Sequence, residues 1–225
     1  MRPEAIVFDM DGLMLDTEPL YKVAWQSGCR ELGYDLTDTT YSTLVGRPTP
    51  ACEQVLLSTF GAAFPLAAFR DRWPSIWQDT VARDGIRQKR GLRPLLEFLR
   101  SRGVPVAVAT STEAHFTEFS LGQAGLAGAF QSVVTGDQVE RGKPAPDIYL
   151  AAAAQLGVAA HCCVALDDSE AGAVAASSAG MVTLLIPDWV PPSSTARQAA
   201  TVVLPSLVEA HAFIEARLLP TESAG

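Results

Sequence analysis

The sequence predicts an α/β fold, because short apolar runs of strand length alternate with segments of helical spacing along most of the chain. Such alternation produces right-handed βαβ units and a parallel sheet with helices on both faces. Between the first two apolar runs, however, residues 16–87 carry helical patterns and no strand signal. We therefore expect a doubly wound, Rossmann-like parallel-sheet core formed by residues 1–15 and 88–225. A small all-helical domain, residues 16–87, is expected as an insert after the first strand.

The first strand is expected at residues 5–8, Ala-Ile-Val-Phe, where an apolar run stops abruptly at an acid. Asp9 and Asp11 leave its carboxyl end, which is where open α/β sheets bind their ligands. Gly12 allows a sharp turn, so that both acids can face one small volume. Two carboxylates so close favour a divalent cation between them, and Mg²⁺ usually brings phosphate with it. The same residues also fit an ordinary Asp-Gly turn.

Four helices are expected in the insert, at residues 16–32, 38–45, 50–60 and 66–81. Thr17, as a capping hydroxyl, and Pro19, in the first turn, mark the start of the first helix. Trp25, Trp73 and Trp77 fall on these helices. We expect them to form the core of the insert rather than a platform on which a sugar stacks.

The other elements of the core follow in alternation after residue 91. Strands are expected at residues 104–109, 132–134, 161–166 and 181–186, and helices at 92–102, 113–121, 147–156, 169–179 and 206–218. Gly103 and Gly157 supply stop signals for two of the helices. Residues 191–194, Pro-Pro-Ser-Ser, are expected to form a loop.

Composition limits the classes of function. The chain has 225 residues, of which 48% are hydrophobic and 19% charged, with a net charge of −8 and no basic stripe. This balance argues against nucleic acid as a partner. The sequence shows no signal peptide and no apolar stretch of membrane-spanning length, and its four cysteines lack metal-ligand spacing. We expect a cytoplasmic monomer that does not bind membranes.

Polar side chains follow the later strands as they follow the first. Thr110 and Ser111 come after the second strand, Lys143 lies in a loop, and Asp167 and Asp168 come after the fourth strand. Each has a structural explanation of its own, since the hydroxyls and the acids could cap helices and the lysine could be solvated. The carboxyl ends of parallel strands nevertheless meet at one edge of a sheet. The converging groups suit a metal ion, a phosphoryl group and a nucleophile.

The motifs in order are DxDG after the first strand, Thr-Ser after the second, GKPxPDIY in a loop, and an acidic pair followed by S-x-A-G. They resemble the four motifs of the haloacid dehalogenase-like superfamily, and the insert resembles its small cap domain. FDMDGLMLDTEPLY and GKPAPDIYLAAA are similar to the branch that holds β-phosphoglucomutase and small sugar-phosphate or nucleotide phosphatases. The resemblance covers the chain to about residue 186. It implies an Mg²⁺-dependent phosphatase, a phosphoric monoester hydrolase that acts on a small phosphorylated metabolite.

The resemblance also implies roles for the acids. Asp9 would attack phosphorus and form an aspartyl-phosphate intermediate. Asp11 would protonate the leaving oxygen and then take a proton from the attacking water. The carboxylates of Asp9 and Asp168 and the main-chain carbonyl of Asp11 would hold Mg²⁺, which offsets the repulsion between nucleophile and phosphate.

Three groups would surround the phosphate by the same resemblance. The hydroxyl of Thr110 and the main-chain N–H of Ser111 would hold phosphate oxygens, and Lys143 would balance their charge. Asp167 would orient Lys143 or a metal-bound water.

In the insert, Gly46-Arg47 matches a place where relatives present an arginine to the distal part of the substrate, although a surface arginine after a glycine fits equally well. Glu18 and Tyr21 lie one turn apart on one helix face and are expected to face the substrate. Phosphomutase relatives carry a histidine at the place of Tyr21, so its absence here favours hydrolysis over mutase activity, the alternative reaction. A phosphorelay receiver domain would also use an acid cluster, a Thr or Ser and a lysine, but it would lack the helical insert.

Overall fold

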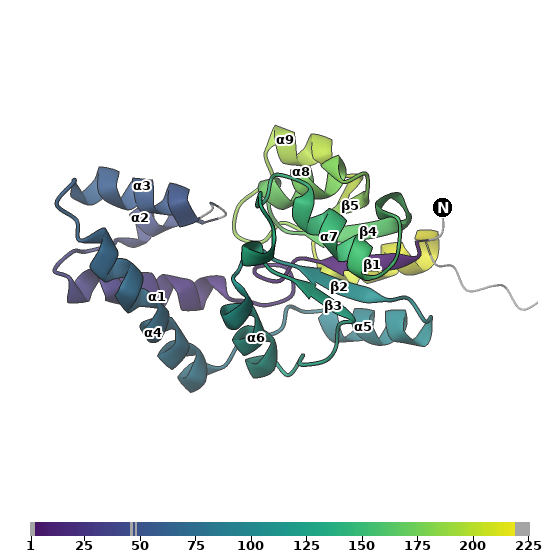
Figure 1. Ribbon diagram of the computed structural model, residues 1–225, viewed down its shortest axis with the longest axis horizontal. Coiled ribbons are helices and arrows are strands. Elements are labelled where there is room, and N and C mark those ends of the chain that lie inside the picture. The colour runs from purple at the N-terminus through teal and green to yellow at the C-terminus, as the bar shows by residue number, and fades with distance from the viewer. Residues whose placement is uncertain (1–2, 46, 48, 219–225) are drawn as a thin grey trace, which may run out of the picture. The chain divides into compact units, whose positions relative to one another are not determined.

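The structure is a computed structural model that describes residues 3–45, 47 and 49–218. The chain folds into two compact units, one formed by the chain up to Asp16 and from Gln88 onward, the other by Thr17–Arg87. We call them the core unit and the inserted unit (Figure 1).

The core unit is built on one sheet of six parallel strands in the order β3-β2-β1-β4-β5-β6. The predicted doubly wound α/β fold is thereby confirmed. The chain runs outward from β1 to β2 and β3 on one side, and from β4 to β5 and β6 on the other. The strands are β1 (Ala5–Phe8), β2 (Val106–Ala109), β3 (Ser132–Val134), β4 (Cys163–Asp167), β5 (Val182–Leu185) and β6 (Val202–Val203).

Helices cover both faces of this sheet, and Figure 1 shows α7 and α8 on one face and α5 on the other. α7 packs on β1, β2 and β3 through small and apolar side chains, among them Ile148 and Ala152. α5 buries a leucine stripe at positions 92, 95 and 99, and each fully buried leucine contributes about 1.5–3 kcal/mol. The helices are α5 (Leu92–Ser101), α6 (Ala114–Gln123), α7 (Asp147–Gln155), α8 (Glu170–Ser178), α9 (Ser194–Ala199) and α10 (Leu207–Phe213).

Two elements near the end of the sheet were not predicted. α9 begins at Ser194, inside the residues expected to form a loop, and the hydroxyl of Ser193 caps it by accepting a hydrogen bond from the N–H of Ala196. β6 has only two residues and pairs with β5 at the edge of the sheet. An edge strand this short leaves too few alternating positions to be recognised in a sequence.

The inserted unit consists of helices α1 (Glu18–Glu31), α2 (Asp38–Ser42), α3 (Thr49–Phe60) and α4 (Leu66–Asp84). One predicted detail is wrong. Thr17 occupies the N-cap position of α1, but its side chain makes no capping hydrogen bond to the described residues of the first turn. The backbone of Thr17 is already helical there, which removes the extended conformation that a capping hydroxyl needs.

The interior of the inserted unit is aromatic. Trp25 packs against Phe69 with ring centroids 5.1 Å apart, and Trp73 lies 5.9 Å from Trp25. Trp77 is fully buried. The tryptophans therefore belong to the core of this unit, as predicted.

None of the helices in the described part of the chain combines the length and the hydropathy that crossing a membrane requires. The cytoplasmic location and the monomeric state stay predictions.

Candidate active site

The site is organised around Asp9, the first residue after β1. Its main-chain N–H continues the ladder by donating to the carbonyl oxygen of Leu166 on β4, 2.9 Å away. β1 lies between β2 and β4. The strands that follow it in the chain extend first to the β2 side and then to the β4 side, so β1 stands at the point where the strand order reverses. Open α/β sheets bind ligands outside the strands at this point. The side chain of Asp9 is almost completely buried there.

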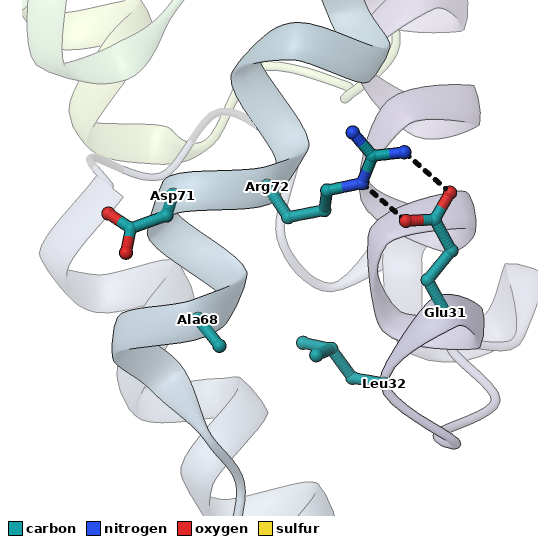
Figure 2. Close-up of a pocket in the computed structure, with 5 residues that line it drawn as sticks. All are labelled: Glu31, Leu32, Ala68, Asp71 and Arg72. Atoms are coloured by element: carbon teal, nitrogen blue, oxygen red, sulfur yellow. Dashed lines mark hydrogen bonds and ion pairs between the residues drawn. The ribbon is translucent and has the colours of Figure 1, made fainter.

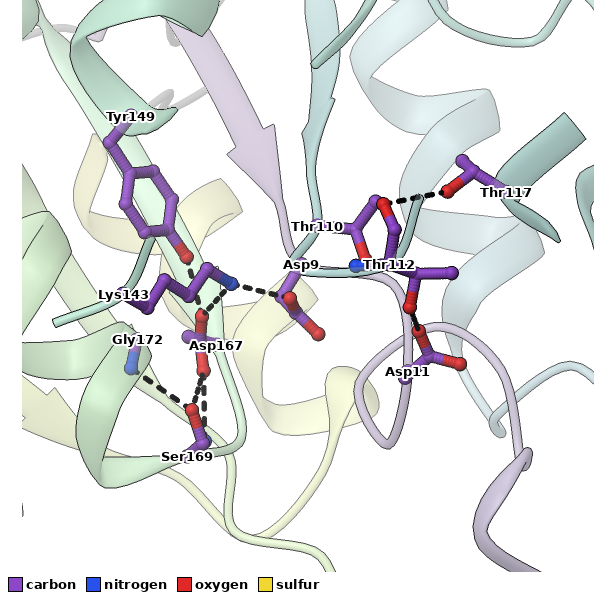
Figure 3. A network of polar contacts seen from close by, with 10 residues as sticks. All are labelled: Asp9, Asp11, Thr110, Thr112, Thr117, Lys143, Tyr149, Asp167, Ser169 and Gly172. Carbon is purple, nitrogen blue, oxygen red and sulfur yellow. Dashed lines mark hydrogen bonds and ion pairs between the residues drawn. The ribbon is translucent and has the colours of Figure 1, made fainter. Parts of the chain in front are cut away.

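Lys143 joins Asp9, which follows β1, to Asp167, the last residue of β4 (Figure 3). Its ammonium lies 2.5 Å from Oδ1 of Asp9 and 2.7 Å from Oδ2 of Asp167. The side chain is only 5% exposed, so the ion pairs act at low local dielectric. Burial lowers the pKa of Lys143, but the charges of Asp167 and Asp9 more than reverse this effect and raise it well above its usual value. Lys143 is therefore a fixed cation beside Asp9.

Asp167 is saturated with hydrogen bonds. Oδ2 accepts from Lys143 and from the hydroxyl of Tyr149 at 2.6 Å, and Oδ1 accepts from the N–H and the hydroxyl of Ser169 at 2.9 and 2.7 Å. Burial alone would raise the pKa of Asp167. The charge of Lys143 and the hydrogen-bond donors lower it by more than burial raises it, so the net shift is downward. Asp167 is held as an anion whose lone pairs are already used.

Asp168 differs from its neighbour. None of the described residues donates a hydrogen bond to its carboxylate, which lies against Gly12, where a Cβ atom would stand 2.3 Å from Oδ2. Burial and then the charges of Asp9 and Asp167 raise the pKa of Asp168 well above its usual value. Oxygen atoms with free lone pairs thus face the turn that follows β1.

The charges of this region fit a bound cation. Burial, opposed by Lys143 and supported by Asp167, raises the pKa of Asp9 to about 8. Asp9 and Asp168 therefore need more positive charge than Lys143 supplies if both are to be ionised near pH 7. Hard carboxylate oxygens suit Mg²⁺ or a similar ion. Among residues 3–45, 47 and 49–218, no cluster of three or more His, Cys, Asp or Glu side chains is arranged to hold a metal. The expected ligand set is smaller than such a cluster, because it has two carboxylates and one main-chain carbonyl.

Asp11, two residues after Asp9, is contacted from the loop after β2. The hydroxyl of Thr112 donates to Oδ2 of Asp11 over 2.7 Å (Figure 3). In turn, the N–H of Thr112 donates to the hydroxyl oxygen of Thr110, 3.1 Å away. Thr110 is buried and Ser111 is exposed. The loop after β2 thus carries three consecutive hydroxyl residues, and Thr112 is the one whose hydroxyl contacts Asp11.

Helix capping does not explain Thr110 and Ser111 in the loop after β2, but it does explain Ser169, which follows β4. α6 begins at Ala114 with Glu113 in the N-cap position, so neither Thr110 nor Ser111 caps it. Ser169 does cap α8, since its hydroxyl accepts from the N–H of Gly172 at 3.0 Å. The same hydroxyl donates to Asp167, which links the helix start to the acid.

The predicted substrate residues of the inserted unit have partners within that unit. The hydroxyl of Tyr41 donates to Glu18 at 2.7 Å, and the ring of Tyr21 stacks on Trp77 with centroids 5.3 Å apart. Arg47 is exposed, while Gly46 lies outside the described residues. These residues stay candidates for contact with the substrate.

A hollow of about 380 Å³ on the inserted unit does not suit a phosphate (Figure 2). Its cation, Arg72, directs two nitrogens at the carboxylate of Glu31, and Asp71 adds a second acid to the lining. The guanidinium is already neutralised, so an anion gains little there.

Sequence reasoning missed two residues of the site, Thr112 and Tyr149. Thr112 is one more hydroxyl beside the pair that was singled out, and Tyr149 reads as an apolar position of α7. Their contacts join positions 101 and 18 residues apart in the chain. Two local signals were present: Thr112 follows the Thr-Ser pair, and Tyr149 is the last residue of the GKPxPDIY motif.

Comparisons with known proteins agree with this geometry. Residues 3–180 match a family model described as haloacid dehalogenase-like hydrolase. The chain is 34% identical to the phosphorylated carbohydrates phosphatase of Thermotoga maritima over 178 residues, 79% of this chain and 82% of that protein. It is 32% identical to the fructose-1-phosphate phosphatase of Escherichia coli over 183 residues, 80% of this chain and 94% of that protein.

A solved structure, described as a putative β-phosphoglucomutase from Thermotoga maritima, superposes with a TM-score of 0.81 at 30% identity. It covers 96% of this chain and 100% of its own. The family match spans most of the core unit and the whole inserted unit. As the four motifs predicted, the chain belongs to the haloacid dehalogenase-like hydrolase family and is a phosphatase of that family.

Proposed function

We propose that this phosphatase hydrolyses a small sugar phosphate through an aspartyl-phosphate formed on Asp9. The observation that carries the proposal is the pairing of Asp9 with the buried ammonium of Lys143, while Asp11, two residues on, is contacted by a hydroxyl. One acid is thereby placed beside a fixed positive charge and the other is placed apart from it. Two carboxylates with different surroundings suit two different roles.

In the first step, an oxygen of Asp9 attacks phosphorus and the bond from phosphorus to the sugar oxygen breaks. Asp11 gives its proton to the departing sugar oxygen, so that an alcohol leaves rather than a strongly basic alkoxide. Lys143 stabilises the negative charge on the phosphoryl oxygens, and the hydroxyl of Thr110 and the N–H of Ser111 donate hydrogen bonds to them in this proposal.

In the second step, water attacks the phosphorus of the aspartyl-phosphate and gives its proton to Asp11. The bond between Asp9 and phosphorus breaks, which releases phosphate and restores both acids. Asp167 holds Lys143 in place throughout, because its four accepted hydrogen bonds leave it no freedom to rotate.

The carboxylates of Asp9 and Asp168 and the main-chain carbonyl of Asp11 would hold a Mg²⁺ ion. When bound, the ion neutralises charge between the anionic nucleophile and the phosphate dianion. The raised pKa values of both carboxyls support this assignment.

The sugar-phosphate class is supported by the relatives, two of which are named for phosphorylated carbohydrates and for fructose 1-phosphate. Hydrolysis rather than phosphoryl transfer between sugar hydroxyls is supported by Tyr21. This residue stands where phosphomutase relatives carry histidine, and its ring is engaged with Trp77.

Released phosphate, measured over a panel of sugar phosphates and nucleotides with and without Mg²⁺, tests the proposal. We expect turnover of one or more sugar phosphates, loss of activity in EDTA and recovery with added Mg²⁺. Phosphorus NMR with β-glucose 1-phosphate and a bisphosphate primer tests for the alternative, phosphomutase activity. Accumulating glucose 6-phosphate would contradict hydrolysis, and full activity after exhaustive chelation would contradict the metal site.

A further inference from the structure

Thr112 lies beside the proton-transfer acid of the proposed mechanism. Its hydroxyl donates to Oδ2 of Asp11 at 2.7 Å, from a loop 101 residues further along the chain. We infer that Thr112 is a positioning residue: it holds the Asp11 carboxyl group so that Oδ1 is the oxygen that gives and takes the proton. The inference rests on the proposed function, because it concerns how Asp11 serves it.

The backbone of Thr112 is itself fixed. Its N–H donates to the hydroxyl oxygen of Thr110, while its carbonyl oxygen accepts from the N–H of Gly136 at 3.1 Å and from the hydroxyl of Thr117 at 3.3 Å. Gly136 is needed for this approach, since a Cβ atom there would stand 2.3 Å from the carbonyl oxygen of Ser111. The hydroxyl that reaches Asp11 is therefore presented from a loop tied on several sides.

Asp11 follows β1 in a tight turn of its own. The N–H of Gly12 donates to the carbonyl of Leu15 at 2.9 Å, and the N–H of Leu15 donates to the carbonyl of Met10 at 3.0 Å. These bonds fix the backbone but leave the side-chain torsions of Asp11 to be set by its contacts. A proton donor that is misplaced by about 1 Å can lose about a hundredfold in rate, so the hydrogen bond from Thr112 bears on the chemistry.

The direction of the bond assigns the two oxygens. Oδ2 accepts a hydrogen bond from the hydroxyl of Thr112 and so is occupied on that side. In the first step the Oδ1–H bond breaks, its proton passes to the sugar oxygen, and the electron pair stays on Oδ1. In the second step Oδ1 takes a proton from water while the water oxygen bonds to phosphorus. Thr112 keeps its own proton in both steps.

A leaving-group comparison separates this role from a merely structural one. Fructose 1-phosphate releases a basic alkoxide that needs a proton, whereas p-nitrophenyl phosphate releases a weak base that scarcely does. The quantity to measure is kcat/KM, because it covers the steps up to departure of the first product and excludes hydrolysis of the aspartyl-phosphate. Any other sugar phosphate that the protein hydrolyses serves equally well.

For Thr112→Val we expect kcat/KM to fall about tenfold to a hundredfold on the sugar phosphate, and less than about threefold on p-nitrophenyl phosphate. Thr112→Ser keeps the hydroxyl and should restore most of the loss. Thr183→Val, which removes a buried hydroxyl from β5, is the matched control and should leave both values unchanged. In an Asp11→Asn background, Thr112→Val should cost nothing further, because the acid through which it acts is already disabled.

Equal losses on the two substrates would overturn the inference and make Thr112 a phosphate-binding or structural residue. So would a failure of Thr112→Ser to restore activity, or an additive loss in the Asp11→Asn background. If Thr112→Val does not fold, Thr112→Ala takes its place in the same comparison, with folding checked by circular dichroism. An unmodified protein that hydrolyses neither substrate would instead overturn the proposed function.

Discussion

The hydroxyl of Tyr149 donates a 2.6 Å hydrogen bond to Oδ2 of Asp167, the same oxygen that accepts from Lys143. The ammonium of Lys143 also lies 5.1 Å from the centre of the Tyr149 ring. All three side chains are buried. A tyrosine of α7 thus shares one carboxylate oxygen with the cation that faces the nucleophile. The hydrogen bond from Tyr149 offsets part of the negative charge of Asp167. We therefore expect Asp167 to attract Lys143 less strongly, so that the ammonium also pairs with Asp9.

Tyr149→Phe should therefore lower activity without abolishing it. The ring keeps its packing, but Asp167 loses one donor, and we expect the free energy of unfolding to fall by about 1–2 kcal/mol. Lys143 should shift its preference from Asp9 toward Asp167, with kcat reduced about threefold to tenfold and KM nearly unchanged. Urea unfolding and steady-state kinetics measure the two effects.

Tyr34→Phe is the control for this change, because the Tyr34 hydroxyl has a hydrogen bond of only 3.5 Å to the carbonyl of Ala63. It should leave both quantities unchanged. An unaltered kcat in Tyr149→Phe would mean that the hydroxyl does not act on Lys143.

Glycine 172 allows Asp167 its position. A Cβ atom on Gly172 would lie 1.8 Å from Oδ2 of Asp167, too close for any side chain. In an ordinary helix position, Gly→Ala stabilises a protein by up to about 1 kcal/mol. We expect the opposite here: Gly172→Ala should displace Asp167, reduce the free energy of unfolding and abolish most activity.

Gly122→Ala on α6 is the matched control, since nothing lies within 4 Å of a Cβ atom at that position. It should leave activity unchanged and raise the melting temperature slightly. Thermal unfolding followed by circular dichroism, together with phosphate release, distinguishes the two variants. A Gly172→Ala protein as active as the parent would show that Asp167 is not held as described.

Lys89 connects two acids of the core unit outside the site. Its ammonium lies 2.9 Å from Asp16 and 2.7 Å from Asp188, and the three side chains are 22%, 31% and 20% exposed. Burial lowers the pKa of Lys89, but the two hydrogen-bonded acids outweigh it and raise the pKa above its usual value. Because the folded state binds this proton more tightly than the unfolded state, the contribution to stability is complete below about pH 10.4 and is lost as the pH rises through the folded pKa.

Lys89→Met should thus reduce the free energy of unfolding by about 1–2 kcal/mol between pH 7 and 9, with a difference that shrinks above about pH 10.4. Urea titrations across this range measure the difference. Lys22→Met is the comparison, because Lys22 pairs with an Asp38 that is 76% exposed, and such surface pairs contribute little. Equal effects of the two substitutions, or a difference that grows with pH, would contradict the account.

Local pattern was enough to predict most of the fold. The strands are continuous apolar runs and the long helices have clear spacing, so the parallel sheet and the helical insert could be read before any contact was known. β6, with two residues, carries too little pattern to be recognised. The N-cap of α1 was misread because the conformation of Thr17, rather than its hydroxyl, decides whether it caps.

The candidate site was only partly predictable. Asp9, Lys143 and Asp167 were expected to converge because they follow neighbouring strands or lie in a motif loop, and the structure brings them into contact. The difference between Asp167 and Asp168 was not visible, since adjacent acids look alike until burial and donors are known. Thr112 and Tyr149 were missed because their importance lies in contacts made across the sheet edge.

The division of work between Asp9 and Asp11 is the central claim, and trapping the intermediate tests it most directly. Asp11→Asn, mixed rapidly with p-nitrophenyl phosphate and Mg²⁺, should release a stoichiometric burst of p-nitrophenolate followed by slow turnover, because the leaving group needs no acid while the second step has lost its base. Acid quenching during the slow phase, followed by peptide mass spectrometry, should find the phosphoryl group on Asp9. Asp9→Asn should show neither burst nor phosphorylated peptide. A burst in Asp9→Asn, or a normal steady state without phosphorylated Asp9 in Asp11→Asn, would contradict the account.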